Sequence, residues 1–130
     1  MNAVIYEVPA LDHDAMMKRK YGTKVSARGK LERRIAWNLL KHLEASGFKV
    51  TSLDDSDNLT NLTGDPKEVM ELLFDLDEAD IYVKKGRHHE HAIRLIFGNG
   101  VDMISDYTFA EGDADGFEAL MNAFDPEECA

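Results

Sequence analysis

The histidine-rich stretch at residues 88–91 is the first place where the residue types suggest chemistry. It reads His-His-Glu-His, and clustered imidazoles are typical zinc ligands. In a strand alternate residues share a face, so His89 and His91 would lie on one side and His88 on the other. Two ligands are fewer than a structural zinc site needs, and no HExxH spacing is present. We therefore expect a solvated hairpin end, no metal site and no cofactor, with a weak metal contact at this cluster as the alternative.

Carboxylates near the C-terminus offer a second kind of chemistry. The candidates are Asp102, Asp106, Glu111, Asp113 and Asp115. Paired acids can act in general acid–base catalysis or bind divalent cations. Asp102 and Asp106 fall on even positions of one expected strand and would share a face. No lysine or calcium-loop pattern accompanies them, so we expect a solvated acidic sheet face with helix caps. The functional alternative is an acidic, non-catalytic face that contacts a basic partner.

The turn Gly98-Asn99-Gly100 has two interpretations. A phosphate-binding glycine loop follows a strand and opens a helix, so that free N–H groups point at the anion. Here the residues after Gly100 are strand-like, and Asn-Gly between two apolar strands is a strong hairpin signal. Asp102 would also repel a phosphate. We expect a hairpin turn whose glycines serve backbone geometry rather than a ligand.

A basic and aromatic stripe runs along an expected helix at residues 30–47. At about 100° per residue, one side of this helix carries Lys30, Arg34, Trp37 and Lys41. Trp and Arg are enriched at binding hot spots, and cations interleaved with an aromatic suit nucleic acid. The alternative is that Trp37 packs under another element with cations around it. His42 falls on the leucine side and is expected to be a hydrogen-bonded, half-buried histidine.

Size and composition bound the class of protein. The chain has 130 residues, of which 44% are hydrophobic and 31% charged, which indicates a single folded domain at 1–130, with 1–29 as a candidate basic arm. No apolar run reaches the roughly 18 residues of a membrane span, and the N-terminus lacks a signal-peptide pattern. We expect a cytoplasmic protein without a membrane partner. Its one cysteine, Cys129, is expected to be an exposed thiol in the tail.

Charge is distributed unevenly along the chain. Residues 1–50 contain ten Lys and Arg against five Asp and Glu, a net charge of +5, whereas residues 51–130 contain five against twenty, a net charge of −15. A compact chain of this kind presents surfaces of opposite potential. The charge pattern therefore concerns partners and not the fold.

Hydrophobic periodicity and turn residues predict the elements that position these side chains. Strands are expected at residues 3–9, 48–53, 80–85, 91–97 and 101–109. Helices are expected at residues 12–21, 30–47, 65–76 and 113–124. The short connections between the last three strands favour an antiparallel meander. The predicted fold is α+β, an antiparallel sheet of four to five strands with three to four helices packed mainly on one face.

The stretch Phe-Gly-Asn-Gly-Val-Asp-Met-Ile-Ser-Asp-Tyr-Thr at residues 97–108 resembles a group of small uncharacterised proteins of bacteriophages and proteobacterial mobile elements. The resemblance runs from Ile35 to Phe124. It is strongest at Gly98, Asn99, Gly100, Asp102, Ile104, Ser105, Asp106 and Tyr107. The resemblance implies a phage or prophage accessory setting and carries no known activity.

Together these patterns favour a non-enzymatic accessory protein that binds a host or phage macromolecule, in its sharpest form an acidic inhibitor that mimics nucleic acid or counters host defence. The first alternative is a nucleic-acid-associated module that uses the basic segment at residues 18–34 and the Trp37 stripe. The second alternative is a small metal-dependent enzyme, for which no motif is present. The oligomeric state and the identity of the partner stay open.

Overall fold

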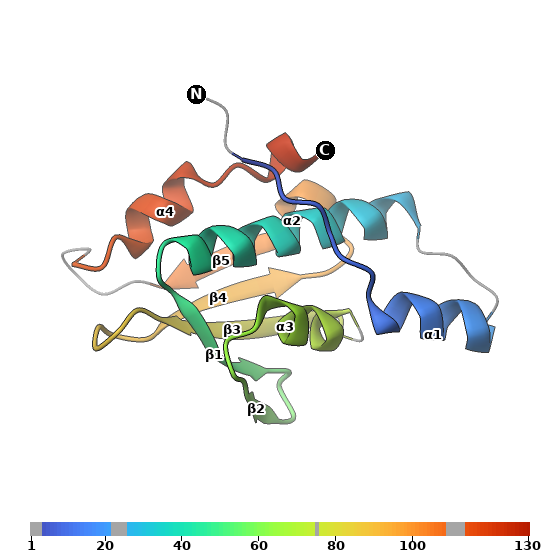
Figure 1. Ribbon diagram of the computed structural model, residues 1–130, viewed down its shortest axis with the longest axis horizontal. Coiled ribbons are helices and arrows are strands. Elements are labelled where there is room, and N and C mark those ends of the chain that lie inside the picture. Colours follow the sequence, from blue (N-terminus) through green and yellow to red (C-terminus); the bar gives the residue numbers. More distant parts are fainter. Residues whose placement is uncertain (1–3, 22–25, 75, 109–113) are drawn as a thin grey trace.

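The computed structural model consists of an antiparallel five-stranded sheet packed against helices (Figure 1). It describes residues 4–21, 26–74, 76–108 and 114–130. The elements follow in the order α1 (Asp12–Tyr21), α2 (Ala27–Ala45), β1 (Lys49–Asp54), β2 (Leu59–Asn61), α3 (Pro66–Leu73), β3 (Glu78–Lys84), β4 (His91–Ile96), the 3₁₀ turn η1 (Gly100–Asp102), β5 (Ile104–Thr108), α4 (Phe117–Ala123) and the 3₁₀ turn η2 (Pro126–Cys129). The predicted α+β class is confirmed.

Helix α2 begins one turn earlier than its periodicity predicts. The reason is Ser26, whose hydroxyl accepts a hydrogen bond from the Gly29 N–H at 3.0 Å and so caps the helix at Ala27. The predicted leucine stripe of this helix is fully buried at Ile35, Leu39 and Leu43. After the helix, Gly47 adopts a φ of +90°, and Phe48 packs into the core as expected.

The strand order of the sheet is β2-β1-β3-β4-β5. Strand β2 lies in a segment that the sequence predicts to be a polar loop. It forms because Asp55 closes a tight turn, accepting hydrogen bonds from the N–H groups of Asp57 and Asn58 at 2.9 and 2.7 Å. This turn folds the chain back onto β1, where Leu59 pairs with Asp54.

The strand predicted at residues 3–9 is wrong for residues 4–9, the part of it that the structure describes. These residues form no helix or strand and cross the outer side of α2 instead (Figure 1). The Asn38 side chain accepts a hydrogen bond from the Tyr6 N–H and donates one to the Tyr6 C=O. In a sheet, a neighbouring strand would bind these two backbone groups. The sheet still has five strands because β2 replaces the expected one.

The last two strands are joined by a longer connection than the expected hairpin turn at Gly98-Asn99-Gly100. After Gly98 and Asn99 the chain makes the turn η1, and β5 therefore starts at Ile104 rather than at residue 101. The glycines adopt positive φ angles, +102° at Gly98 and +62° at Gly100. Such angles are accessible to glycine without a steric penalty.

Helices α3 and α4 close the core over the sheet. Asp65 caps α3 by accepting the Lys67 N–H at 3.0 Å, and Pro66 occupies the first helical position. The helix ends at Leu73, three residues before its predicted end. In α4, Phe117 and Met121 are buried among the core residues.

Candidate functional site

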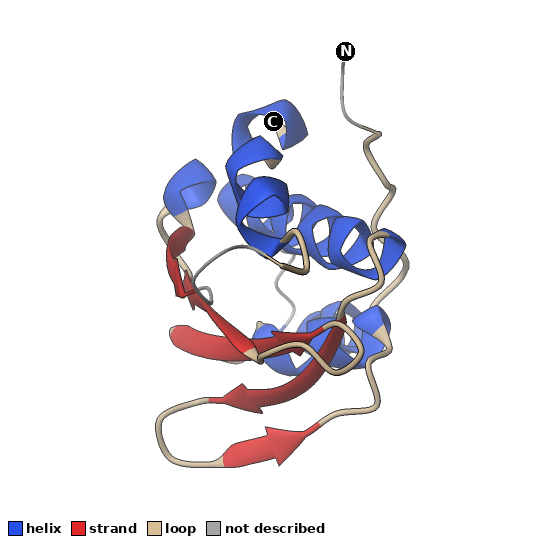
Figure 2. Cartoon of the chain, turned by 90° about the vertical axis from the view of Figure 1, so that its left-hand side faces the viewer, coloured by secondary structure: helices blue, strands red, loops and turns tan. Residues whose placement is uncertain are grey.

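The sheet has a second face on the side away from the helices, which we name the open face (Figure 2). It follows from the period of two in a strand. In β3, the odd residues Ala79, Ile81 and Val83 are buried toward the helices. The even residues of β3 point the other way and are exposed or half-buried.

One row of side chains crosses the open face from β1 to β5. The register pairs Asp54 with Asp80, Asp80 with Arg94, and Arg94 with Asp106. Directly opposed side chains on neighbouring strands lie about 5 Å apart. Glu78 lies on the same face, two residues before Asp80. We name these five residues, four carboxylates and one guanidinium, the acidic row.

Arg94 neutralises only part of this charge. Its Nε and Nη2 atoms donate to the two oxygens of Asp80 at 3.0 and 3.1 Å, a bidentate pair. The hydrogen bond to Asp80 raises the pKa of Arg94 above its usual value. Asp106, on the other side of Arg94, accepts the Tyr107 N–H at 2.8 Å and makes no ion pair within the described residues. The acidic row therefore keeps a net charge of −3.

A shallow hollow lies beside the row. Its volume is 260 Å³, and it is lined by Asp80, Ala92, Arg94, Asp106, Tyr107 and Thr108. This volume is below the usual range for a drug-sized ligand, but it suits a single lysine or arginine side chain. The other end of the open face is different, because Lys49 and Lys84 pair there. The binding capacity for cations is thus confined to one half of the face.

A buried pair joins His91 to Asp115. The His91 Nε2 and Asp115 Oδ2 atoms are 2.6 Å apart, and both side chains are at most 4% exposed. The His91 ring stacks on Phe117 with centroids 4.0 Å apart. Burial disfavours the charged form of Asp115, but the hydrogen bonds from His91 and from the Phe117 N–H outweigh it and hold the pKa of this carboxyl below its usual value.

The burial of this pair indicates a structural role. A general base must reach the proton that it abstracts, whereas His91 is 2% exposed. Asp115 stands just before α4, and His91 opens β4. The bond therefore holds the start of α4 against β4.

The Gly98–Gly100 turn binds an anion, contrary to the prediction that its glycines serve only the backbone. One carboxylate oxygen of Glu32, Oε2, accepts the N–H of Gly98 at 2.7 Å and the N–H of Gly100 at 3.0 Å. Successive N–H groups in residues of opposite helical sense form an anion-binding concavity. The anion is the chain's own side chain, 5% exposed, on α2.

The predicted acidic face is corrected by the structure. Asp115 is buried and paired with His91, so it is not part of an exposed surface. Asp102 lies in η1 and Asp106 in β5, so they do not share a strand face, although both are exposed. Glu111 and Asp113 lie outside the described residues. Of the predicted acids, Asp106 alone is found in the acidic row.

The predicted basic stripe is largely engaged with the chain itself. The Arg34 Nε donates to the Cys129 carbonyl at 2.8 Å. Lys41 forms an ion pair with Glu44 at 2.8 Å and lies over the rings of Tyr6 and Trp37. Trp37 itself packs half-buried against the core, and Lys30 is exposed. Trp37 therefore packs within the chain, as in the alternative interpretation.

Two further predictions concern single residues. Cys129 is 4% exposed and not an exposed tail thiol, because η2 folds back onto α2. Burial raises the pKa of this thiol. His42 is half-buried and its Nε2 lies 2.9 Å from the Val4 carbonyl, as expected of a hydrogen-bonded histidine. His88 and His89 are exposed in the β3–β4 turn.

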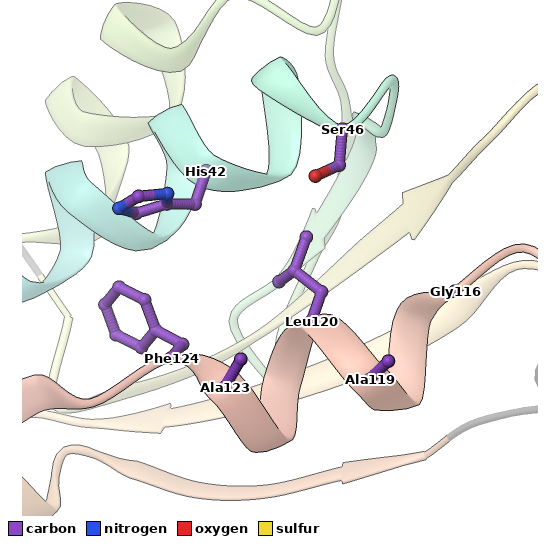
Figure 3. A pocket seen from close by; sticks show the side chains of 7 residues that line it. All are labelled: His42, Ser46, Gly116, Ala119, Leu120, Ala123 and Phe124. Carbon is purple, nitrogen blue, oxygen red and sulfur yellow. The ribbon is translucent and has the colours of Figure 1, made fainter. Parts of the chain in front are cut away.

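A second hollow lies between α2 and α4 (Figure 3). It has a volume of 420 Å³ and is lined by His42, Ser46, Gly116, Ala119, Leu120, Ala123 and Phe124. The polar residues His42 and Ser46 stand on the α2 side, facing Leu120 of α4 and Phe124 just after this helix. No group of three or more potential metal ligands occurs in the part of the chain that the structure describes.

Comparison of the chain with protein-family models, with curated proteins and with solved structures finds no significant match. Among the described helices, none is both long and apolar enough to cross a membrane.

Most of the acidic row was not predicted from the sequence. Its members Asp54, Asp80 and Arg94 lie in three different strands, and only the register of the sheet brings them together. One signal was present in the sequence: polar or amphipathic residues alternate with apolar ones in β3, which indicates one solvated face.

Proposed function

We propose that this protein is a non-enzymatic binding protein that uses the acidic row to hold a cationic surface of a macromolecular partner. The observation that carries the proposal is the cross-strand alignment of Asp54, Asp80 and Asp106 on a face that no described helix covers. A lysine or arginine of the partner fits the hollow beside Arg94 and meets the carboxylate of Asp106.

The charges of the acidic row favour association with a basic surface, but each ion pair that it forms is weak. Exposed pairs each contribute about 0.2–1 kcal/mol and are screened beyond a Debye length of about 8 Å at physiological salt. A row of carboxylates therefore gives fast, salt-sensitive association with a basic surface. Carboxylates aligned on an exposed face are suited to cationic groups, so binding is the activity that the acidic row supports.

The finer form of the proposal is an accessory protein of a phage or mobile element that occupies the basic groove of a nucleic-acid-binding protein. It is supported by the net charge of −15 over residues 51–130 and by the repeat of carboxylates across strands about 5 Å apart. Immobilised protein should capture basic nucleic-acid-binding proteins from a host lysate, and added DNA should elute them. If no such protein is recovered, the hypothesis of an accessory protein that occupies a basic groove is contradicted. The broader proposal, that the acidic row binds a cationic surface, is tested separately by peptide binding.

That experiment measures binding of a deca-arginine peptide by calorimetry. The double variant Glu78→Gln/Asp106→Asn removes two charges that have no ion pair in the described structure. We expect its affinity to fall about three- to tenfold, and Arg94→Gln to bind more tightly than the unmodified chain.

The matched control is Glu127→Gln/Glu128→Gln, which removes the same charge from exposed positions of η2. Its affinity should stay within about twofold of the unmodified chain, because these two carboxylates lie outside the acidic row and make no contact with a partner bound there. Equal losses in the two double variants would show that only net charge matters, and would contradict the proposed site.

A further inference from the structure

The N-terminal segment, residues 4–9, is bound to α2 in the way that a protein binds an extended peptide. It crosses the outer side of α2 without entering the sheet (Figure 1). Val4 and Ile5 contribute little burial, at 63% and 46% exposed, whereas Tyr6 and Val8 are half-buried. The hydrogen bonds that hold the segment are made by its backbone.

Asn38 supplies the main contact. Its side chain is completely buried. Its Oδ1 accepts the Tyr6 N–H at 2.6 Å, and its Nδ2 donates to the Tyr6 carbonyl at 3.1 Å. The same Nδ2 donates to the Arg34 carbonyl at 2.8 Å, which fixes the amide in orientation. One amide thus satisfies both backbone groups of one residue, as an adjacent strand does.

His42 extends this recognition by two residues. Its Nε2 lies 2.9 Å from the Val4 carbonyl, so Val4 and Tyr6, which share one side of an extended chain, are both held. The Tyr6 ring packs edge-on against His42 with centroids 5.4 Å apart and lies below the Lys41 ammonium. The ring contact favours an aromatic side chain at this position, whereas the hydrogen bonds to Asn38 involve only the backbone.

An unfilled hollow lies next to the position of residues 4–6 on α2. His42 also lines the 420 Å³ hollow between α2 and α4, where Leu120 and Phe124 form an apolar wall (Figure 3). Because Val4 leaves most of its side chain in solvent, the hollow is not filled by the chain's own segment. A larger apolar side chain next to the histidine contact would reach it.

We infer that the outer face of α2 at Asn38 and His42 is a peptide-binding site. Its ligand is an extended segment of a partner protein with an aromatic residue at the Asn38 contact and a large apolar residue two positions earlier. The chain's own residues 4–6 occupy this site in the free protein. The partner segment displaces them, keeps the two backbone hydrogen bonds to Asn38 and fills the hollow.

The test uses the full-length variant Tyr6→Pro and a synthetic peptide of residues 1–9. Proline removes the N–H that Asn38 accepts and so weakens the occupant segment without shortening the chain. Circular dichroism and the unfolding midpoint establish that the variant is folded. We expect fluorescence anisotropy to show at least tenfold tighter peptide binding by Tyr6→Pro than by the unmodified protein, and tighter binding still when the peptide carries Phe in place of Val4.

Backbone methylation of the peptide gives the matched control. An N-methyl group at Tyr6 removes the donor to Asn38 and should abolish binding. An N-methyl group at Ile5, whose N–H has no partner in the described structure, should change it by less than about twofold, since no hydrogen bond is lost. Failure of folded Tyr6→Pro to bind the peptide, or equal binding of the two methylated peptides, would overturn the inference. If the unmodified chain forms a dimer and the variant Asn38→Ala is monomeric, the occupant of the site is a second copy of this chain. That result would overturn the inference that the occupant is a segment of a different protein.

Discussion

Glu32 and Gly98 lie 66 positions apart in the sequence, yet a carboxylate oxygen of Glu32 accepts the Gly98 N–H at 2.7 Å. The same oxygen accepts the Gly100 N–H. The carboxylate of Glu32 therefore holds the turn between β4 and β5 against α2. This contact sets where β5 begins, and with it the position of Asp106 in the acidic row.

The first prediction concerns this contact. The variant Glu32→Ala should lose about 1–3 kcal/mol in free energy of unfolding, because two N–H groups of the turn lose their acceptor. The variant Glu44→Ala removes an exposed helix carboxylate paired with Lys41 and should lose less than about 1 kcal/mol. Urea denaturation measures both, and equal losses would show that the turn does not depend on Glu32.

The extent of sequence-based prediction differs between elements for physical reasons. Local signals such as the Asp65 cap, the leucine stripe of α2 and the apolar pattern of α4 were sufficient to predict three helices. The apolar stretch at residues 3–9 has strand-forming residues, but a buried asparagine on α2 binds its backbone instead. Glu32 and Asn38 accept hydrogen bonds from residues far away in the sequence, and such contacts produce no periodic pattern in the sequence. The strand register that aligns the acidic row produces no such pattern either.

The second prediction concerns acid stability. The pKa of Asp115 is lower in the folded chain than its ordinary value of 3.8, so the unfolded chain binds a proton more readily. The stabilisation is therefore fully present above the unfolded pKa and is lost as the pH falls through the folded pKa. Free energies of unfolding from pH 6 to pH 2 should fall more steeply for the unmodified chain than for Asp115→Asn. Parallel curves would contradict the assigned His91–Asp115 bond.

The third prediction concerns the buried cysteine. Because burial raises the pKa of the Cys129 thiol, a thiolate-specific reagent should label the native protein slowly compared with the urea-unfolded chain. Arg34→Ala removes the hydrogen bond to the Cys129 carbonyl and should speed labelling about fivefold or more, as expected for loss of about 1 kcal/mol. Lys30→Ala, an exposed change on the same helix, should leave the rate unchanged. Mass spectrometry follows the reaction, and rapid labelling of the unmodified chain would mean that η2 does not cover the thiol.

Binding of a cationic partner at the acidic row is tested most directly by amide chemical shifts. Isotopically labelled protein is titrated with deca-arginine at low salt, and the shift of every assigned amide is followed. We expect the largest shifts at Asp54, Asp80, Arg94 and Asp106, and we expect these shifts to disappear at high salt. Largest shifts in α4 and η2, with those four residues unchanged, would show that the partner surface lies elsewhere.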